Sequence, residues 1–270
     1  MRADRRLIIN ADDYGHCREV NDAVEQLDQA GLLGGVSVLA AGAGVAQAIE
    51  YLRARARLAA GIHLNAVEGP PLSAAAAPIL EAGRFPRLPK LMLRWMLRPR
   101  DVARAVETEW RAQIERLLEA GIRLHHADSH QHLHAFPPAF ECAVRLCREY
   151  GIPAIRMPNE HLRDRRRFAG ALGVRTSLAL AQFTVSTRGL RRNDHFLGFR
   201  QAGHYTLQTL LADIASLPAG LTELAVHPST RDGVPYLAYK SDRERAALLD
   251  PTFRDGLRDL GVKPVSWLNA

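Results

Sequence analysis

The sequence has few cysteines and no long apolar run. Its 270 residues include three cysteines, Cys17, Cys142 and Cys147, without any CxxC spacing. This excludes a fully paired disulfide framework and disfavours a cysteine-based zinc site. We interpret the cysteines as reduced thiols, typical of a cytoplasmic protein. No stretch approaches the roughly 18 apolar residues that a membrane-spanning helix needs. The apolar run at residues 7–9 is too short for a signal peptide.

The composition is basic but otherwise ordinary. Lys and Arg total 36 against 29 Asp and Glu, giving a formal charge of +7, and 47% of residues are hydrophobic, as in globular proteins. A basic balance fits nucleic acid, anionic lipid, an acidic substrate or an arginine-rich composition. The segment RDRRRF (163–168) raises the nucleic-acid hypothesis. Since no RNA-binding aromatic motif or zinc-finger spacing accompanies it, we predict no nucleic-acid partner.

Apolar runs alternate with amphipathic helical patterns along the chain. We predict strands at 6–11, 34–42, 57–66, 123–134, 152–158, 221–229 and 262–270, and helices at 18–31, 44–55, 100–121, 137–151, 206–220 and 242–261. Residues 161–203 read as a helix followed by a loop. The alternation predicts an α/β fold, a distorted, TIM-barrel-like (β/α) barrel of about seven or eight parallel strands, with an open doubly wound sheet as the alternative. We expect one domain, 1–270, with an excursion at about 69–100 rich in Pro and Gly.

Acids and histidines cluster where the predicted strands end. In such a fold the active site lies at the carboxyl ends of the strands. Asp12 and Asp13 follow the first strand, His63 the third, and His227 a late one; Asp128, Ser129, His130, His132 and His134 form a further cluster. One Asp and two His would satisfy a catalytic divalent metal site, with a position left for water. Metal ligation therefore explains the pattern better than a cysteine or serine mechanism.

The adjacent acids suggest two roles. Alternation along a strand would point one carboxylate at a metal and its neighbour at the attacking water, although an Asp pair before a helix is also a common cap. His130, His132 and His134 share a face if the strand persists, whereas His125 and His126 are expected to be structural. His227 is a candidate general acid, or else a histidine bonded to a carbonyl. Mixed N/O ligation leaves Zn and Mg both open.

Several motifs occur in a specific order: NADDYG, GIHLNAVEGPPL, HADSHQHLH with FPPAF, IRMP and TELAVHP. Over residues 7 to about 230 this order resembles the YdjC-like carbohydrate deacetylases. The resemblance implies a distorted barrel and metal-dependent hydrolysis of an N-acetyl group from an acetylated amino sugar. It implies Asp13, His63 and His130 as ligands of one divalent ion, Asp12 as general base and His227 as general acid. We also expect substrate contacts from Asn65, His132 and Arg156, the last of which could instead orient the base.

Within that family, residues 84–102 and 191–199 are more similar to the hopanoid-biosynthesis-associated, HpnK-type members, which implies an N-acetylglucosaminyl lipid as substrate. Residues 88–100 interleave apolar side chains with Lys and Arg, which suits a peripheral helix on an anionic inner membrane face. A lid or a homodimer contact is the alternative for that segment. The rival function is a metal-dependent phosphoesterase or another amidohydrolase on a similar barrel.

Overall fold

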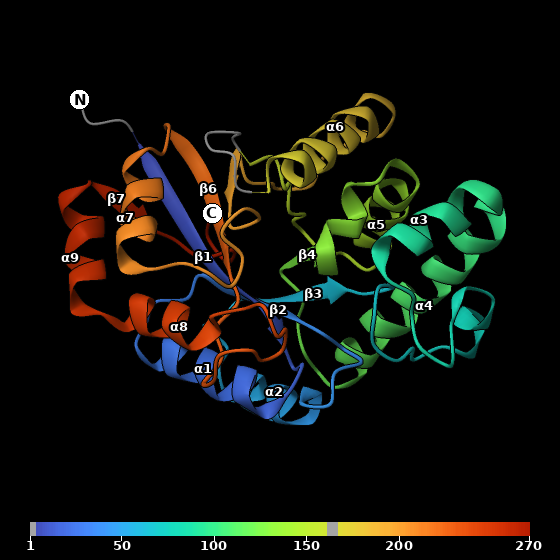
Figure 1. Cartoon of the computed structure of the whole chain (residues 1–270), viewed down its shortest axis with the longest axis horizontal. Coiled ribbons are helices and arrows are strands. Elements are labelled where there is room, and N and C mark those ends of the chain that lie inside the picture. Colours follow the sequence, from blue (N-terminus) through green and yellow to red (C-terminus); the bar gives the residue numbers. More distant parts are fainter. Residues whose placement is uncertain (1–3, 161–166) are drawn as a thin grey trace.

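The protein contains a parallel sheet with helices around it (Figure 1). This computed structural model describes residues 4–160 and 167–270. The strand order is β4-β3-β2-β1-β6-β5, and β7 also pairs with β1. The strands are β1 (Arg5–Tyr14), β2 (Gly35–Val38), β3 (Ala60–Leu64), β4 (His126–Ser129), β5 (His195–Leu197), β6 (Gly220–Val226) and β7 (Val262–Pro264). The predicted α/β class with parallel strands is therefore confirmed.

The sheet is curled, but the closed barrel is not shown. Its continuous ladder ends at β4 and β5. Between those edges the described residues form only isolated parallel bridges, Ala127 with Ile155 and Ala154 with Arg191. The strand predicted at 152–158 is thus wrong as a regular strand, because its prolines, Pro153 and Pro158, lack the amide hydrogens that a ladder needs. The short strand β5, which pairs with β6, was not predicted.

The helices mostly follow the predicted pattern. They are α1 (Arg18–Gln29), α2 (Val45–Arg53), α3 (Leu88–Leu97), α4 (Pro99–Glu119), α5 (Pro137–Glu149), α6 (Phe168–Thr184), α7 (Leu207–Ala215), α8 (Ser241–Leu249) and α9 (Pro251–Asp259). The helix predicted at 242–261 is two helices, because Pro251 cannot continue α8 and instead begins α9. The carboxylate of Asp250 caps α9 by accepting a bond from the Thr252 amide at 2.8 Å.

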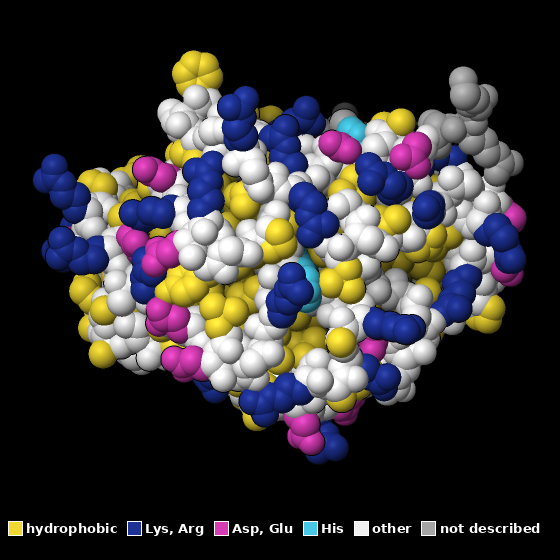
Figure 2. Space-filling model, turned by 180° about the vertical axis from the view of Figure 1, so that it is seen from behind, with side chains coloured by type: hydrophobic (Ala, Val, Ile, Leu, Met, Phe, Trp, Pro, Cys, Tyr) yellow, Lys and Arg dark blue, Asp and Glu magenta, His cyan; other side chains and the backbone are white. Residues whose placement is uncertain are grey.

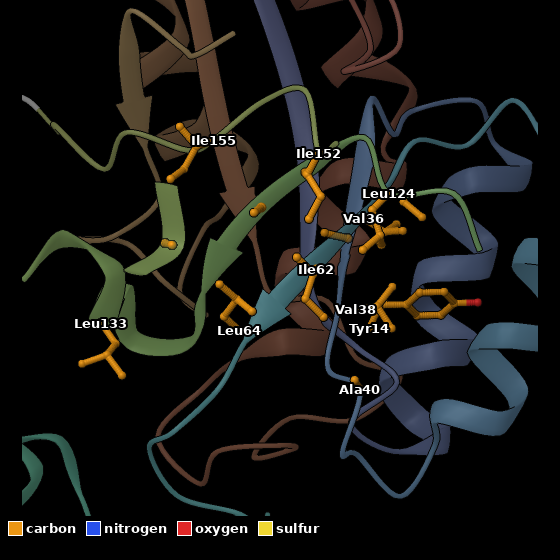
Figure 3. Packing of buried hydrophobic residues seen from close by; sticks show 14 of the residues in the cluster. Tyr14, Val36, Val38, Ala40, Ile62, Leu64, Leu124, Leu133, Ile152 and Ile155 are labelled. Carbon is orange, nitrogen blue, oxygen red and sulfur yellow. The ribbon is translucent and has the colours of Figure 1, made fainter. Parts of the chain in front are cut away.

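The core lies on both sides of the sheet. The stripe predicted for α1, Val20, Val24 and Leu27, is buried. Figure 3 shows Tyr14 pointing from the end of β1 towards the first helices, and its hydroxyl lies 3.3 Å from Oε1 of Glu25 on α1. This packing holds the carboxyl end of β1 against α1 and so positions the two acids that precede Tyr14.

The predicted excursion at about 69–100 lies between β3 and α4. It contains a 3-10 helix, η1 (Ala74–Ile79), and α3. The buried carboxylate of Glu109 on α4 accepts hydrogen bonds from the amides of Leu72 and Ser73, at 2.8–3.1 Å. Charge-assisted bonds of this kind are stronger than neutral ones. They fasten the excursion to α4 beside the sheet.

Three further predictions concern the cysteines, membrane-spanning helices and the basic segment at 163–168. Cys17, Cys142 and Cys147 are free. No helix in the described parts of the chain is long and apolar enough to span a bilayer. Most of the basic segment 163–168 lies outside the described residues.

Candidate metal centre

The two acids of the first motif diverge because β1 is irregular at its end. Its register with β2 shifts between Ala11 and Tyr14. Asp13 has φ of 60°, a left-handed conformation that Asp adopts more readily than most residues. Such an irregularity redirects side chains near active sites. The carboxylates of Asp12 and Asp13 therefore have different partners, as expected, but through a local backbone turn rather than strand alternation alone.

Asp13, His63 and His130 come together from three separate segments. Oδ1 of Asp13 lies 3.4 Å from Nε2 of His63 and 3.1 Å from Nδ1 of His130. One ligand atom from each residue lies within 4.8 Å of the others, and all three residues are buried. Oδ2 of Asp13 is buried without a hydrogen-bond partner among the described residues. A carboxylate and two imidazoles, with one acceptor unsatisfied, fit a divalent cation such as Zn²⁺.

The charge of Asp13 also favours the binding of a cation. Burial by itself raises its pKa, but the charges and hydrogen bonds of His130 and His63 hold the pKa well below its usual range. Asp13 is therefore an anion at neutral pH. An anionic oxygen without a partner in the interior is a strong reason to expect a cation there.

Asp128 fixes the orientation of His63. Its Oδ1 lies 2.7 Å from Nδ1 of the ring, which leaves Nε2 facing Asp13. A carboxylate behind a histidine ligand is a common arrangement at metal sites, where it sets the tautomer. Burial lowers the pKa of His63, but the charge and hydrogen bond of Asp128 outweigh it and raise the pKa to about 10, so a cation that binds this ring must displace its proton. Asp128 was noted in the motif, but this role was not predicted.

A second group, Asp12, His63 and Asp128, also lies within ligand distance. Arg156 occupies it, because NH1 contacts Oδ2 of Asp12 at 2.6 Å and NH2 contacts Oδ2 of Asp128 at 2.7 Å. A fixed guanidinium charge disfavours a cation at that position. The candidate metal centre is therefore the group with Asp13.

Arg156 is fully buried, which corrects one of its two predicted roles. It has 0% exposure and donates to both oxygens of Asp12 and, through Nε, to Oε1 of Glu223 at 2.9 Å. A side chain enclosed in this way is not available to substrate. The geometry favours the alternative, in which Arg156 orients the carboxylate of Asp12.

The histidine cluster does not share one face, because the strand ends at Ser129. Residues 130–135 form a 3-10 segment, η2, and Gln131 and His132 have φ of 51° and 54°. His130 consequently contacts Asp13, whereas the ring of His132 packs against Phe196 at 5.3 Å. His134 is buried, with Nδ1 2.6 Å from Oγ of Ser129. The condition for the shared face, a persistent strand, is not met.

His227 lies directly after β6 and lines the cavity of the metal centre. This cavity has a volume of about 600 Å³, and Asp12, Asp13, His63 and His132 also line it. Nδ1 of His227 has no hydrogen-bond partner among the described residues. Burial lowers its pKa, and the nearby charges of Asp12 and Asp13 oppose that shift. A ring nitrogen without a protein partner thus lies in the same cavity as the two acids.

Asn65 lies at the edge of a neighbouring cavity of about 1080 Å³. Its amide accepts a bond from the Val67 amide at 2.8 Å and donates to the Glu68 carbonyl at 3.1 Å. The side-chain oxygen and nitrogen of Asn65 therefore both form hydrogen bonds within its own loop. Its contact with substrate stays a prediction.

Tyr236 was missed by the sequence analysis. Its hydroxyl lies 3.1 Å from Nε2 of His130, and the two rings stack with centroids 5.7 Å apart. It lines both the metal-centre cavity and the neighbouring one. A tyrosine in an irregular loop 106 residues from its partner carries no local signal that could have identified it.

The order of motifs and the fold have a direct counterpart among known proteins. The family model described as YdjC-like protein matches residues 6–259. The chain belongs to the YdjC-like family. The closer similarity of this YdjC-like chain to HpnK-type members stays a prediction.

Relatives of this YdjC-like chain share a common description. The carbohydrate deacetylase of Mus musculus is 31% identical over 244 residues, covering 83% of this chain and 77% of that protein. The carbohydrate deacetylase of Oceanobacillus iheyensis is 34% identical over 149 residues, covering 55% of this chain and 63%, less than two thirds, of that protein. A structure from Enterococcus faecalis V583, named for cellobiose-phosphate cleavage, covers 98% of both chains with a TM-score of 0.77 and 23% identity. That last likeness establishes the fold.

Proposed function

We propose that this YdjC-like protein is a metal-dependent carbohydrate deacetylase. It would hydrolyse the N-acetyl group of an acetylated amino sugar, giving acetate and a free amine. The observation that carries the proposal is the buried group of Asp13, His63 and His130, with an unsatisfied carboxylate oxygen, in one cavity with Asp12 and His227. Family membership and relatives named as carbohydrate deacetylases support the same reaction.

Each of these residues has a separate role in the proposed reaction. Asp13, His63 and His130 would hold one divalent ion, which when bound supplies Lewis acidity to the acetyl carbonyl and the attacking water. Asp12 takes a proton from that water while the oxygen of the water bonds to the carbonyl carbon. Oδ2 of Asp12 accepts one bond, from Arg156, among the described residues, so it retains a lone pair for this proton.

The departing amine needs a proton when the C–N bond breaks. His227 is the donor in this proposal, because it lines the same cavity as Asp12 and its Nδ1 has no hydrogen-bond partner among the described residues. An imidazole is suited to such transfer near neutral pH. After acetate leaves, Asp12 releases its proton to solvent and His227 takes a proton up from solvent, so the cycle restores both groups.

Two substrate classes fit this chemistry, soluble N-acetylated oligosaccharides and N-acetylglucosaminyl lipids. The resemblance of residues 84–102 and 191–199 to HpnK-type members favours the lipid. A panel containing both classes decides between them by the ratio of kcat/KM values. A higher value for the oligosaccharide would reject the lipid assignment and leave deacetylation intact.

The central experiment measures acetate release from N-acetylglucosamine conjugates, together with the metal content of the purified protein. We expect one bound divalent ion, whose identity, Zn or Mg, the metal analysis gives, and activity that chelator abolishes and the ion restores. Asp13→Ala and His130→Ala should lose both ion and activity, whereas the matched surface variant Asp22→Ala should keep both. Acetate release that persists in the first two variants would reject this site.

The rival phosphoesterase has less support. Such enzymes commonly hold two metals about 3.5–4 Å apart, and here Arg156 fills the second acidic group. Release of phosphate, rather than acetate, from a mixed substrate panel would favour the rival.

A further inference from the structure

Exposed apolar side chains are unevenly distributed over this protein. Of the ten large ones that are exposed among the described residues, eight lie on α3, on α6 or in the loop at 231–240. They are Leu93, Met96 and Leu97 on α3, Phe168, Leu172, Leu180 and Phe183 on α6, and Leu237 in the loop. The most exposed are Leu237 at 95% and Phe183 at 92%. We refer to these eight residues as the apolar rim.

The apolar rim is adjacent to the metal-centre cavity. Leu88, the first residue of α3, lines this cavity, and so do Gly170 and Val174 of α6. Leu172 lies on the side of α6 away from these two residues, since it is two positions from each of them along the helix. Leu237 follows Tyr236, which lines the cavity as well. All three segments that carry the rim therefore also form walls of the cavity.

The exposed residues are not the core-facing sides of these helices. α3 already buries Leu91 and Trp95, and α6 buries Ala171, Leu178 and Ala181. A surface helix normally presents polar residues opposite its buried stripe. Both helices instead carry apolar residues on two sides. Exposed apolar surface of this kind is typical of a protein or membrane interaction site.

The charges beside the apolar rim are positive on balance. Neither α3 nor α6 contains an Asp or Glu, whereas α3 has Lys90 and Arg94 and α6 has Arg175. Lys90 and Arg94 both pair with a single carboxylate, that of Glu81, and Arg98, Arg100 and Asp101 follow α3, so basic residues outnumber acidic ones. Figure 2 shows one face of the molecule, where Lys and Arg side chains, with some Asp and Glu, stand among exposed hydrophobic ones. Apolar residues flanked by basic ones suit the interface of an anionic bilayer, with apolar side chains in the acyl boundary and cations at the headgroups.

We propose that α3, α6 and Leu237 dock this protein on an anionic lipid surface. The contact is peripheral, because no helix in the described residues could span a bilayer. The alternative, a contact between two copies of the chain, is less favoured, because pairing two basic rims would bring like charges together. This inference does not depend on the deacetylase proposal, since it concerns the surface beside the cavity and not its chemistry.

The test is sedimentation of the full chain with two kinds of vesicle, phosphatidylcholine alone and phosphatidylcholine mixed with phosphatidylglycerol. We expect binding to the anionic vesicles that weakens as salt rises. Leu97→Ser with Phe183→Ser should lower the partition coefficient about tenfold, because two apolar anchors are lost. The matched control, Leu118→Ser with Leu268→Ser, removes two exposed apolar residues outside the rim and should bind as the parent does.

Three outcomes would overturn the proposal. These are no binding of the parent to anionic vesicles, equal binding by the rim variant and the parent, and concentration-dependent dimers in ultracentrifugation that the rim variant alone loses. Acetate release from a soluble substrate is measured on the same samples. Unchanged release in the rim variant separates a failure of docking from a failure of the deacetylase proposal.

Discussion

Arg156 binds both carboxylate oxygens of Asp12, with NH1 2.6 Å from Oδ2 and NH2 2.7 Å from Oδ1. A bidentate pair of this kind fixes the plane of the carboxylate as well as its position. Asn10 donates a third bond to Oδ1 at 2.8 Å. The proposed general base is therefore held rigidly near the end of β1, where it is buried.

Replacing Arg156 by Lys tests this relationship. A single ammonium cannot reproduce two parallel bonds, so we expect kcat to fall about 100-fold, within the range for a misplaced general base. KM and metal content should change little. Arg148→Lys is the control, because Arg148 is exposed and donates to backbone carbonyls away from the site. An unchanged kcat in a folded Arg156→Lys protein would remove Arg156 from the mechanism.

Asp128→Asn should weaken metal binding. The change removes the negative charge 2.7 Å from Nδ1 of His63 and frees that ring to rotate or change tautomer. Loss of such a partner typically costs about 10–100-fold in metal affinity, which titration with a competing chelator measures. Glu223→Gln is the matched control, since Glu223 is equally buried and contacts Arg156 but not His63. Equal losses in both variants would point to general damage rather than to orientation of His63.

The strand ends that carry the site could be predicted from sequence. Parallel strands present their carboxyl ends at one edge of a sheet, so acids and histidines that follow apolar runs are expected to meet there. Asp13 and His63 lie at the carboxyl ends of β1 and β3, and the structure brings them together with His130. Their roles remain predictions. Their proximity could be predicted from the hydrophobic periodicity of the sequence and from the parallel pairing of the strands.

Other features depended on long-range contacts or on single backbone angles. The turn that separates His130 from His132 rests on two residues with positive φ, neither of them glycine. Arg156 was expected either to contact substrate or to orient the base, and only its bonds to Asp12, 144 residues away, favour the second role. The curled sheet without a continuous closing ladder likewise follows from prolines at 153 and 158, whose effect on pairing depends on neighbours distant in sequence.

Tyr236→Phe tests a residue that the sequence did not identify. The hydroxyl 3.1 Å from Nε2 of His130 restrains that ring, so its loss should lower metal affinity by up to about tenfold. The stacking of the two rings persists in the variant, which keeps the structural change small. Tyr239→Phe provides the control, because Tyr239 lines the same cavity and its ring contacts His227 and Tyr236 rather than His130, contacts that a phenylalanine ring keeps. Identical metal affinity in parent and Tyr236→Phe would assign the tyrosine to substrate contact or packing alone.

His126 should make the protein sensitive to acid. Its ring stacks on Trp267 with centroids 5.1 Å apart, and a Cβ at Gly61 would lie 2.3 Å from its Nε2, so the ring fills a space that only glycine leaves open. Burial lowers the pKa of His126 from 6.5 to about 3. The folded state therefore excludes a proton that the unfolded chain accepts.

The sign of the pH effect follows from that shift. The contribution of His126 to stability is fully present above pH 6.5 and is lost as pH falls towards about 3, with a slope of at most about 1.4 kcal/mol per pH unit. His126→Gln keeps a partner for the Ser37 hydroxyl, which lies 3.1 Å from Nε2, but cannot be protonated. Urea unfolding in chelator should show a lower stability for the variant at pH 7 and a shallower decline below pH 6.5. Parallel curves for parent and His126→Gln would show that protonation of this buried imidazole does not cause the loss of stability in acid.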